Sequence, residues 1–385
     1  MSWRTVRFND VSASYLEQKA EIDAAVAQVI ARGDFINGAA VRNFESAFAT
    51  YCGCGHAVGT SNGTSALHLA LLASGVAPGD EVITTPMTFI ATAEAITHAG
   101  AQVRFADIDP AALNLSPTAF EQAITAKTRA VLFVHLHGNP AGIADVAAIA
   151  RKHNLVLIED CAQAHGALLT PKASQQLSCT RRDDGRAHVG SFGDAAAYSF
   201  FPAKNLGAFG DAGIVTTANA DIAKRAHMLA NHGRTEKYQH DIEGFNYRLD
   251  TLQAAVLLVK LAHLDQQVEQ RNRLATVYEE QFKGLPITMQ QPEPGTRHGR
   301  HLFVIHTPER DGLQQHLEAN HIETGIHYPL PLHLQEAYAH LQLKKGSLPA
   351  AEQAAKTTLS LPLYPQLPPE QVEFVARTVR AFFGG

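Results

Sequence analysis

The feature that most constrains the fold is an alternation of short apolar runs with helical patterns between about residue 56 and residue 220. Strands that alternate with helices at this spacing form a mostly parallel sheet with helices on both faces. We therefore expect an α/β fold. The predicted strands are 81–85, 103–107, 130–136, 155–160, 196–200 and 214–217, and the predicted helices between them include 65–74, 90–98, 117–124 and 143–153.

A long helical pattern at 251–282 follows this region and leads into a stretch rich in proline and histidine. That stretch contains a strand-like run at 301–306 and a helix-like run at 312–320. A chain of 385 residues is long enough for two domains. We expect a large domain at 1–250 and a smaller C-terminal α+β domain at 251–385.

The charge balance argues against two classes of partner. The formal net charge is −5 and no basic cluster stands out, whereas nucleic acids and anionic membranes require clustered Lys and Arg. No secretory signal and no membrane-spanning apolar run is evident, so we expect a cytoplasmic protein. The 20 histidines and four cysteines lack metal-binding spacing, and we predict no metal. Small-molecule chemistry is favoured.

Three local patterns carry chemistry, and the first is a phosphate-binding turn. Residues 61–65 read SNGTS and run directly into a predicted amphipathic helix. The free N–H groups and the positive dipole of a helix start suit a phosphate. An ordinary helix cap at Ser61 or Asn62 would give the same pattern.

The second pattern is acidic. Glu159 and Asp160 end a predicted parallel strand, at the sheet edge where open α/β folds bind ligands. One of these carboxylates should face the cleft, where it can keep a pyridine nitrogen protonated. A strand-end acid that caps the following turn remains an alternative.

The third pattern is a lysine among aromatic residues and glycines, in the stretch YSFFPAKNLGAFGDAG from Tyr198. Such surroundings desolvate the ammonium group of Lys204 and lower its pKa, as a Schiff-base lysine requires. A loop lysine with its head in water is the alternative for this pattern alone. The three patterns in this order are much harder to obtain by chance.

At this point the sequence resembles the DegT/DnrJ/EryC1/StrS group of sugar aminotransferases, within the fold type I pyridoxal-phosphate enzymes. The resemblance covers nearly the whole chain. It rests on stretches that begin at Phe35, Ser61, Leu157, Tyr198, Phe245 and Ile326, the last two reading FNYRLDTLQAAVLLVKLAHLD and IHYPLPLH.

The resemblance implies pyridoxal 5'-phosphate as cofactor and a role for each matching residue. Lys204 would form the Schiff base, and Asp160 would pair with the pyridine nitrogen. Gln163 would contact the ring hydroxyl and Phe89 would stack on the ring. The phosphate would be bound by Gly63, Thr64, Ser65 and Ser199, and by Asn246 from the second subunit of a homodimer with shared active sites.

The resemblance also implies the substrates, a nucleotide-linked keto-sugar and an amino donor, L-glutamate. Arg248, His327 and Tyr328 match sugar-nucleotide contacts. His165 either lines this pocket or makes a structural hydrogen bond. The run NLGAFGDAG after the lysine is similar to members that aminate carbon 3, whereas members that act at carbon 4 more typically carry Thr-Thr-Gly-Glu-Gly-Gly there. A carbon-4 enzyme and a non-catalytic sensor are the alternatives.

Two other functions fit less well. A dehydratase of the same family has histidine in place of Lys204. A nicotinamide-dependent oxidoreductase would carry Gly-x-Gly-x-x-Gly after the first strand, which this chain lacks. The chain departs from the family by a longer segment between Asp160 and Lys204. Its polar part, 170–188, predicts a mobile loop that gates or lines the sugar-nucleotide entrance.

Overall fold

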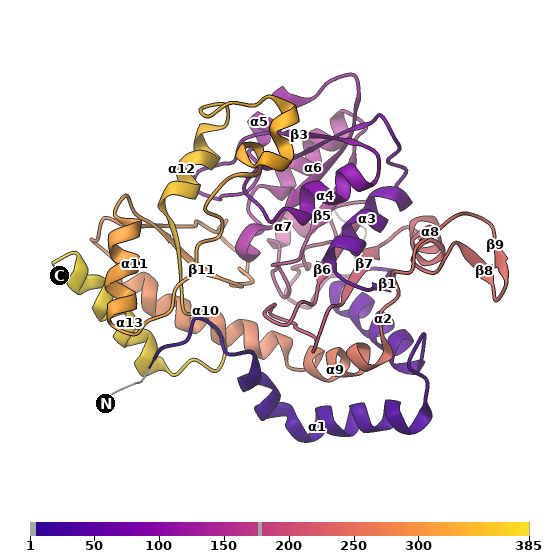
Figure 1. Ribbon diagram of the computed structural model, residues 1–385, viewed down its shortest axis with the longest axis horizontal. Coiled ribbons are helices and arrows are strands. Elements are labelled where there is room, and N and C mark those ends of the chain that lie inside the picture. Colours follow the sequence, from indigo (N-terminus) through magenta and orange to yellow (C-terminus); the bar gives the residue numbers. More distant parts are fainter. Residues whose placement is uncertain (1–4, 176–178, 385) are drawn as a thin grey trace.

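The structure is a computed structural model that describes residues 5–175 and 179–384. Its centre is a seven-stranded sheet in the order β1-β7-β6-β5-β4-β2-β3 (Figure 1). Strand β7 is antiparallel to both of its neighbours, and the pairs from β6 through β3 are parallel. The expected mostly parallel sheet is confirmed. The strands are β1 (His56–Thr60), β2 (Glu81–Thr84), β3 (Gln102–Phe105), β4 (Thr128–Val134), β5 (Val156–Asp160), β6 (Ala195–Ser199) and β7 (Gly213–Thr217).

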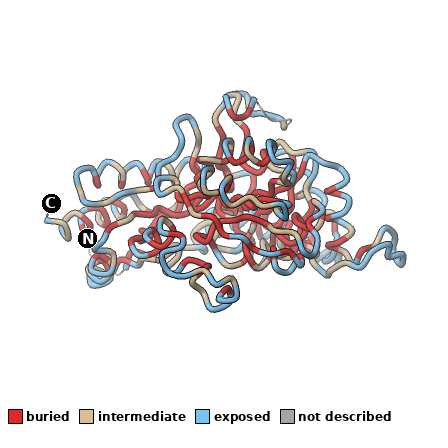
Figure 2. Tube along the Cα trace, turned by 90° about the horizontal axis from the view of Figure 1, so that it is seen from above, coloured by how far each residue is buried: buried red, intermediate tan, exposed pale blue. Residues whose placement is uncertain are grey.

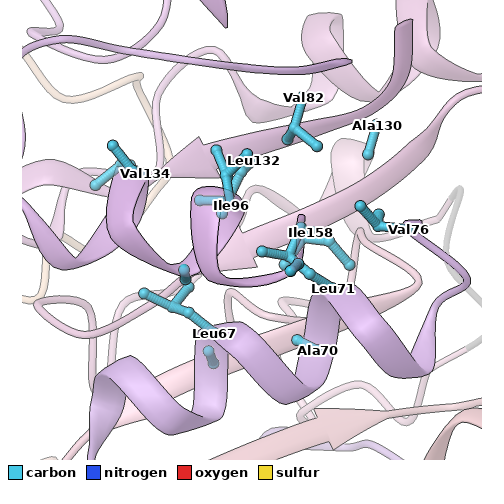
Figure 3. Packing of buried hydrophobic residues seen from close by; sticks show 14 of the residues in the cluster. Leu67, Ala70, Leu71, Val76, Val82, Ile96, Ala130, Leu132, Val134 and Ile158 are labelled. Carbon is cyan, nitrogen blue, oxygen red and sulfur yellow. The ribbon is translucent and has the colours of Figure 1, made fainter. Parts of the chain in front are cut away.

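Alternate residues of β4 divide between the two faces of the sheet. Ala130, Leu132 and Val134 belong to one buried cluster, whereas Val131 and Phe133 belong to another. Figure 3 shows the first cluster, with side chains of α3 against those of β2, β4 and β5. On that side lie α3 (Gly63–Ala73), α4 (Ala91–His98) and α8 (Ala220–Ala230); on the other lie α2 (Ala39–Cys52), α5 (Pro117–Ala123), α6 (Ile143–Lys152) and α9 (Thr251–Leu261).

A third buried cluster holds the C-terminal part together. It joins α10 to a small sheet in the order β10-β11-β12 and to α13. Figure 1 shows this part beside the large sheet, with α1 below α9. The elements are α1 (Val11–Arg32), α10 (Leu264–Gln281), β10 (Thr288–Met289), β11 (Phe303–His306), α11 (Arg310–Ala319), α12 (Pro349–Thr357), β12 (Thr358–Leu361) and α13 (Pro369–Phe382).

Two sequence expectations need correction. The long helical pattern at 251–282 is divided into two helices. The chain turns at Ala262 and His263, whose amides donate to carbonyls three residues earlier, those of Val259 and Lys260. Strand β1 was missed, since five residues with few large apolar side chains give little periodicity. The domain boundary at residue 250 stays a prediction.

The inserted segment at 170–188 is more tightly held than a free loop. It begins with the short helix α7 (Pro171–Ser174), and the amide of Thr180 donates to the carbonyl of Gly53 over 3.0 Å. Arg182 donates to Asp265 over 2.9 Å. Residues 176–178 lie outside the described residues. These contacts hold the segment against the end of α2 and the start of α10. The gating role stays a prediction.

Buried residues form a continuous band through the middle of the molecule, and exposed ones cover the rim (Figure 2). Two strands, β8 (Arg234–Glu236) and β9 (Gln239–His240), form a hairpin that projects away from the body. Across the described residues, no helix combines the length and the apolar character needed to cross a membrane.

Candidate active site

Asp160 ends β5 at the carboxyl edge of the parallel strands and is 5% exposed. One carboxylate oxygen accepts a hydrogen bond from the hydroxyl of Thr92 at 2.8 Å, and the other accepts from the amide of Ala162 at 3.0 Å. Burial raises the pKa of this carboxyl, and the two hydrogen bonds and the nearby charge of Lys204 oppose that rise. Asp160 is thus held in place as an acceptor inside the protein.

Lys204 lies in the turn that follows β6. Its amide donates to the carbonyl of Phe201 over 2.8 Å, and the amide of Ala208 donates to the carbonyl of Phe200 over 2.8 Å, which closes the turn. Burial lowers the pKa of Lys204 to about 8, and the charge of Asp160 acts in the opposite direction. An amine with this pKa is mostly protonated at pH 7 but loses its proton far more readily than an ordinary lysine, so it can act as a nucleophile or a base.

The start of α3 and the end of β6 form a narrow cradle. A Cβ atom on Gly63 would lie 2.6 Å from Cβ of Ser199, so the two backbones approach as closely as glycine allows. Asn62 and Ser65 form a reciprocal cap, with the amide of Ser65 donating to the Asn62 side chain over 2.8 Å. The hydroxyl of Ser65 donates to the Asn62 carbonyl. Ser65 is therefore engaged in the cap, which leaves the amides of Gly63 and Thr64 and the Thr64 hydroxyl for an anion.

Gln163 connects two parts of the chain. Its side-chain oxygen accepts from the amide of His137 at 2.9 Å, and its amide nitrogen donates to the Tyr328 hydroxyl at 3.2 Å. The rings of Tyr328 and Phe89 are 6.2 Å apart, and Phe89 is 57% exposed. The charge of Asp160 adds to burial in raising the pKa of Tyr328, which places this tyrosine near the carboxylate.

His165 and His327 also lie within electrostatic reach of Lys204. His165 is 1% exposed, with both ring nitrogens unpartnered, and burial followed by the lysine charge lowers its pKa to about 3. Nδ1 of His327 is 2.9 Å from the Ser360 hydroxyl, and the same two effects lower its pKa to about 4. Both imidazoles are neutral at pH 7.

The remaining predicted residues lie in one segment beside α3. The carbonyl of Tyr247 accepts from the amide of Ser61 at 2.8 Å, and Arg248 pairs with Thr60. Asn246 is exposed, whereas Nε of Arg248 is buried without a partner. The segment thus borders the cradle of its own chain and presents Asn246 outward.

Glu159 faces away from Asp160 and has a structural role. Its carboxylate accepts from the amides of Gly190, Phe192 and Gly193 at 2.7–2.9 Å and lies 2.8 Å from Nε2 of His135. With Cys161, these side chains form a buried group whose potential ligand atoms lie within 4.8 Å of one another. The carboxylate is already saturated with donors, so the group is explained by packing.

The arrangement fits a flat pyridine ring that carries a phosphate. The cradle at Gly63 and Ser199 offers the amides of a helix start, and the buried carboxylate of Asp160 lies within electrostatic reach of the partly neutral Lys204. The exposed ring of Phe89 offers a stacking face. Residues 16–380 match the sequence profile of the DegT/DnrJ/EryC1/StrS aminotransferase family. The chain belongs to this family.

Relatives of this aminotransferase match it from end to end. It is 44% identical to a pleiotropic regulatory protein of Geobacillus stearothermophilus over 97% of each chain. It is 43% identical to the dTDP-3-amino-3,4,6-trideoxy-alpha-D-glucose transaminase of Streptomyces venezuelae, with 97% of this chain and 95% of the relative covered. The crystal structure of DesV from S. venezuelae with a ketimine intermediate superposes with a TM-score of 0.93, at 42% identity over 99% of each chain.

These findings confirm the fold class, the aminotransferase activity and the pyridoxal-phosphate dependence that the sequence predicts. The roles of single residues stay predictions. The aminotransferase also contains site residues that the sequence reasoning missed. Thr92 holds Asp160, Thr88 lies 2.8 Å from Thr92 between hydroxyl oxygens, and His137 orients Gln163. The spacing of Thr88 and Thr92, four residues apart at a helix start, was the available signal.

Proposed function

We propose that this aminotransferase transfers an amino group from L-glutamate to carbon 3 of a nucleotide-linked keto-sugar, as a homodimer with shared active sites. The observation that carries the proposal is a desolvated Lys204 within electrostatic reach of a buried, hydrogen-bonded Asp160, together with the cradle formed by Gly63 and Ser199. Relatives named for sugar transamination support the substrate class.

The cofactor, when bound, supplies an electron sink for the carbon that gains or loses a proton. Asp160 holds the proton of the pyridine nitrogen, and Thr92 and the amide of Ala162 keep this carboxylate in position. Lys204 carries the proton at Nζ between the substrate carbon and the cofactor, because its lowered pKa lets it both accept and donate near neutral pH.

Substrate recognition falls to residues around this centre. Arg248, with a buried unpartnered Nε, supplies a cationic donor for a diphosphate. His327 and Tyr328 bring a neutral imidazole and a phenol to the same site, and Gln163 fixes the phenol. The neutral ring of His165 has two unpartnered nitrogens for a hydrogen bond with substrate.

The homodimer is supported by large apolar side chains that one chain leaves exposed. Leu16 and Ile30 of α1 are 67% and 58% exposed. Further exposed apolar residues follow α1 or flank Lys204, namely Phe35, Ile36, Phe201 and Phe209. Exposed apolar side chains of this size favour contact with a second subunit.

The test is to supply matched 3-keto and 4-keto nucleotide sugars with L-glutamate and to locate the new amine by NMR. Amination of the 3-keto compound supports the proposal. Turnover of the 4-keto compound alone would move the site to carbon 4 and leave the aminotransferase assignment in place.

A non-catalytic sensor is the second candidate, and the name of the Geobacillus relative favours it. A sensor would bind the cofactor and the nucleotide sugar without turnover. Purified protein that aminates neither keto-sugar, although cofactor and substrate are both bound, would support the sensor.

A further inference from the structure

A small cavity lies beneath the turn that carries Lys204. Its wall is formed by the start of α1, by residues 202–205, by Lys260 near the end of α9, by Gln267 and Arg271 in the first half of α10, and by residues 364–366. It leaves about 30 Å³ for the centres of water-sized molecules. Since one water needs roughly 10–15 Å³ by this measure, the cavity has room for about two or three water-sized particles.

Two buried cations face this cavity. Lys260 is 5% exposed and Arg271 is 4% exposed. Nζ of Lys260 donates to the carbonyl of Gly207 over 2.5 Å and lies 5.7 Å from the centre of the Phe209 ring. Nη1 of Arg271 donates to three backbone carbonyls, those of Arg300, His301 and Leu363, while its Nε has no partner.

No carboxylate among the described residues neutralises either cation. Buried Lys and Arg are almost always paired, because an isolated buried charge is unfavourable. Burial lowers the pKa of Lys260 to about 8 and that of Arg271 to about 9, and in neither case does a nearby acid oppose the effect. Both side chains remain mostly charged at pH 7.

The rest of the wall offers a further donor. Helix α1 begins at Val11 on this wall, with Asp10 as its N-cap and a kink at Gln18. The hydroxyl of Ser14 is buried without a partner. Asp10 is the carboxylate among the described wall residues, and it accepts from Ser12 and pairs with Arg7.

We propose that this cavity binds a small monovalent anion of the size of chloride. Lys260, Nε of Arg271 and the hydroxyl of Ser14 surround the ion. It offsets two charges directly behind the Lys204 turn, and it fixes Lys260, which in turn holds the carbonyl of Gly207 in that turn.

Bromide identifies the ion directly. Crystals of the holoenzyme grown in sodium bromide should give an anomalous peak bounded by Lys260, Arg271 and Ser14. A well-ordered density without anomalous signal at this position means that water fills the cavity, and it overturns the proposal.

Melting temperatures test the same site in solution. At equal ionic strength, 100 mM chloride should raise the melting temperature of the wild-type holoenzyme over that in gluconate by on the order of 2 °C. Lys260→Met should lose this difference. Lys224→Met, which removes the same charge from an exposed position on α8, should keep it.

A bromide peak that persists in Lys260→Met, or an equal chloride effect in all three proteins, means an adventitious ion only and overturns the proposal. Should Lys260→Met fail to fold, the wild-type bromide experiment decides alone.

Discussion

Adding one methyl group at Gly63 should weaken cofactor binding while the fold persists. Gly63 is the first residue of α3, and its backbone conformation is open to alanine, so Gly63→Ala is a steric change only. The new Cβ would lie 2.6 Å from Cβ and 3.1 Å from Oγ of Ser199, and 3.2 Å from its Cα. No side-chain rotation of Ser199 removes the first and third contacts, so the two backbones must separate.

The magnitude follows from the cost of overpacking. Extra methyl groups in packed sites cost roughly 1–3 kcal/mol. If this strain is relieved by moving the helix start away from β6, the phosphate loses its fit to the first-turn amides. Because about 1.4 kcal/mol corresponds to a tenfold change, the dissociation constant of pyridoxal phosphate should rise about 5- to 140-fold.

The assay is a cofactor titration of the apoenzyme followed by absorbance, with the melting temperature of each variant measured alongside. Gly55→Ala is the matched control, since its new Cβ would lie no closer than 3.7 Å to any neighbour, and it should bind as the wild type does. Wild-type affinity in Gly63→Ala would refute the phosphate cradle between α3 and β6.

Three further predictions concern protons, stability and subunits. In the apoenzyme, the rate of cofactor attachment should rise with pH around a midpoint near 8, because only the neutral amine of Lys204 reacts. In Asp160→Asn this midpoint should fall, since the carboxylate that raises the pKa of Lys204 is gone. A wild-type midpoint near the ordinary 10.5 would contradict the assignment. Glu159→Gln should lower the free energy of unfolding by about 2–4 kcal/mol, because the NH₂ group of the new glutamine cannot accept from a backbone amide. Glu269→Gln, at a 53% exposed position, should change the free energy of unfolding little. Equal urea unfolding curves for the two variants would rule out this role of Glu159. Mixed dimers of Lys204→Ala and Asn246→Ala subunits should regain activity if Asn246 serves the partner's site, and no rescue after verified exchange would indicate a site within one chain.

The parts of the fold that the sequence predicts well are those with strong periodicity. Strand β4 is apolar on both faces and reads as a buried parallel strand without ambiguity. The break between α9 and α10 could not be read, because Ala262 and His263 are compatible with a continuous helix. The change in chain direction at these two residues depends on tertiary packing.

Site residues that lie in a motif were predictable from the sequence. Residues that hold them in place from distant positions in the chain were not. Lys204 and Asp160 lie in recognisable runs, whereas Thr92 reaches Asp160 from 68 positions away in the chain. Gln163 is oriented by the backbone amide of His137, and the side-chain type at position 137 gives no sign of this hydrogen bond. The choice between Glu159 and Asp160 required the strand register, since alternate residues face opposite sides of the sheet.

The most direct test of the account is borohydride reduction of the holoenzyme, followed by proteolysis and mass spectrometry. The account predicts that the reduced cofactor is found on the peptide that contains Lys204, and that Lys204→Ala retains cofactor affinity in titration but takes up no covalent label. A label on a different lysine, or a labelled Lys204→Ala protein, would contradict it.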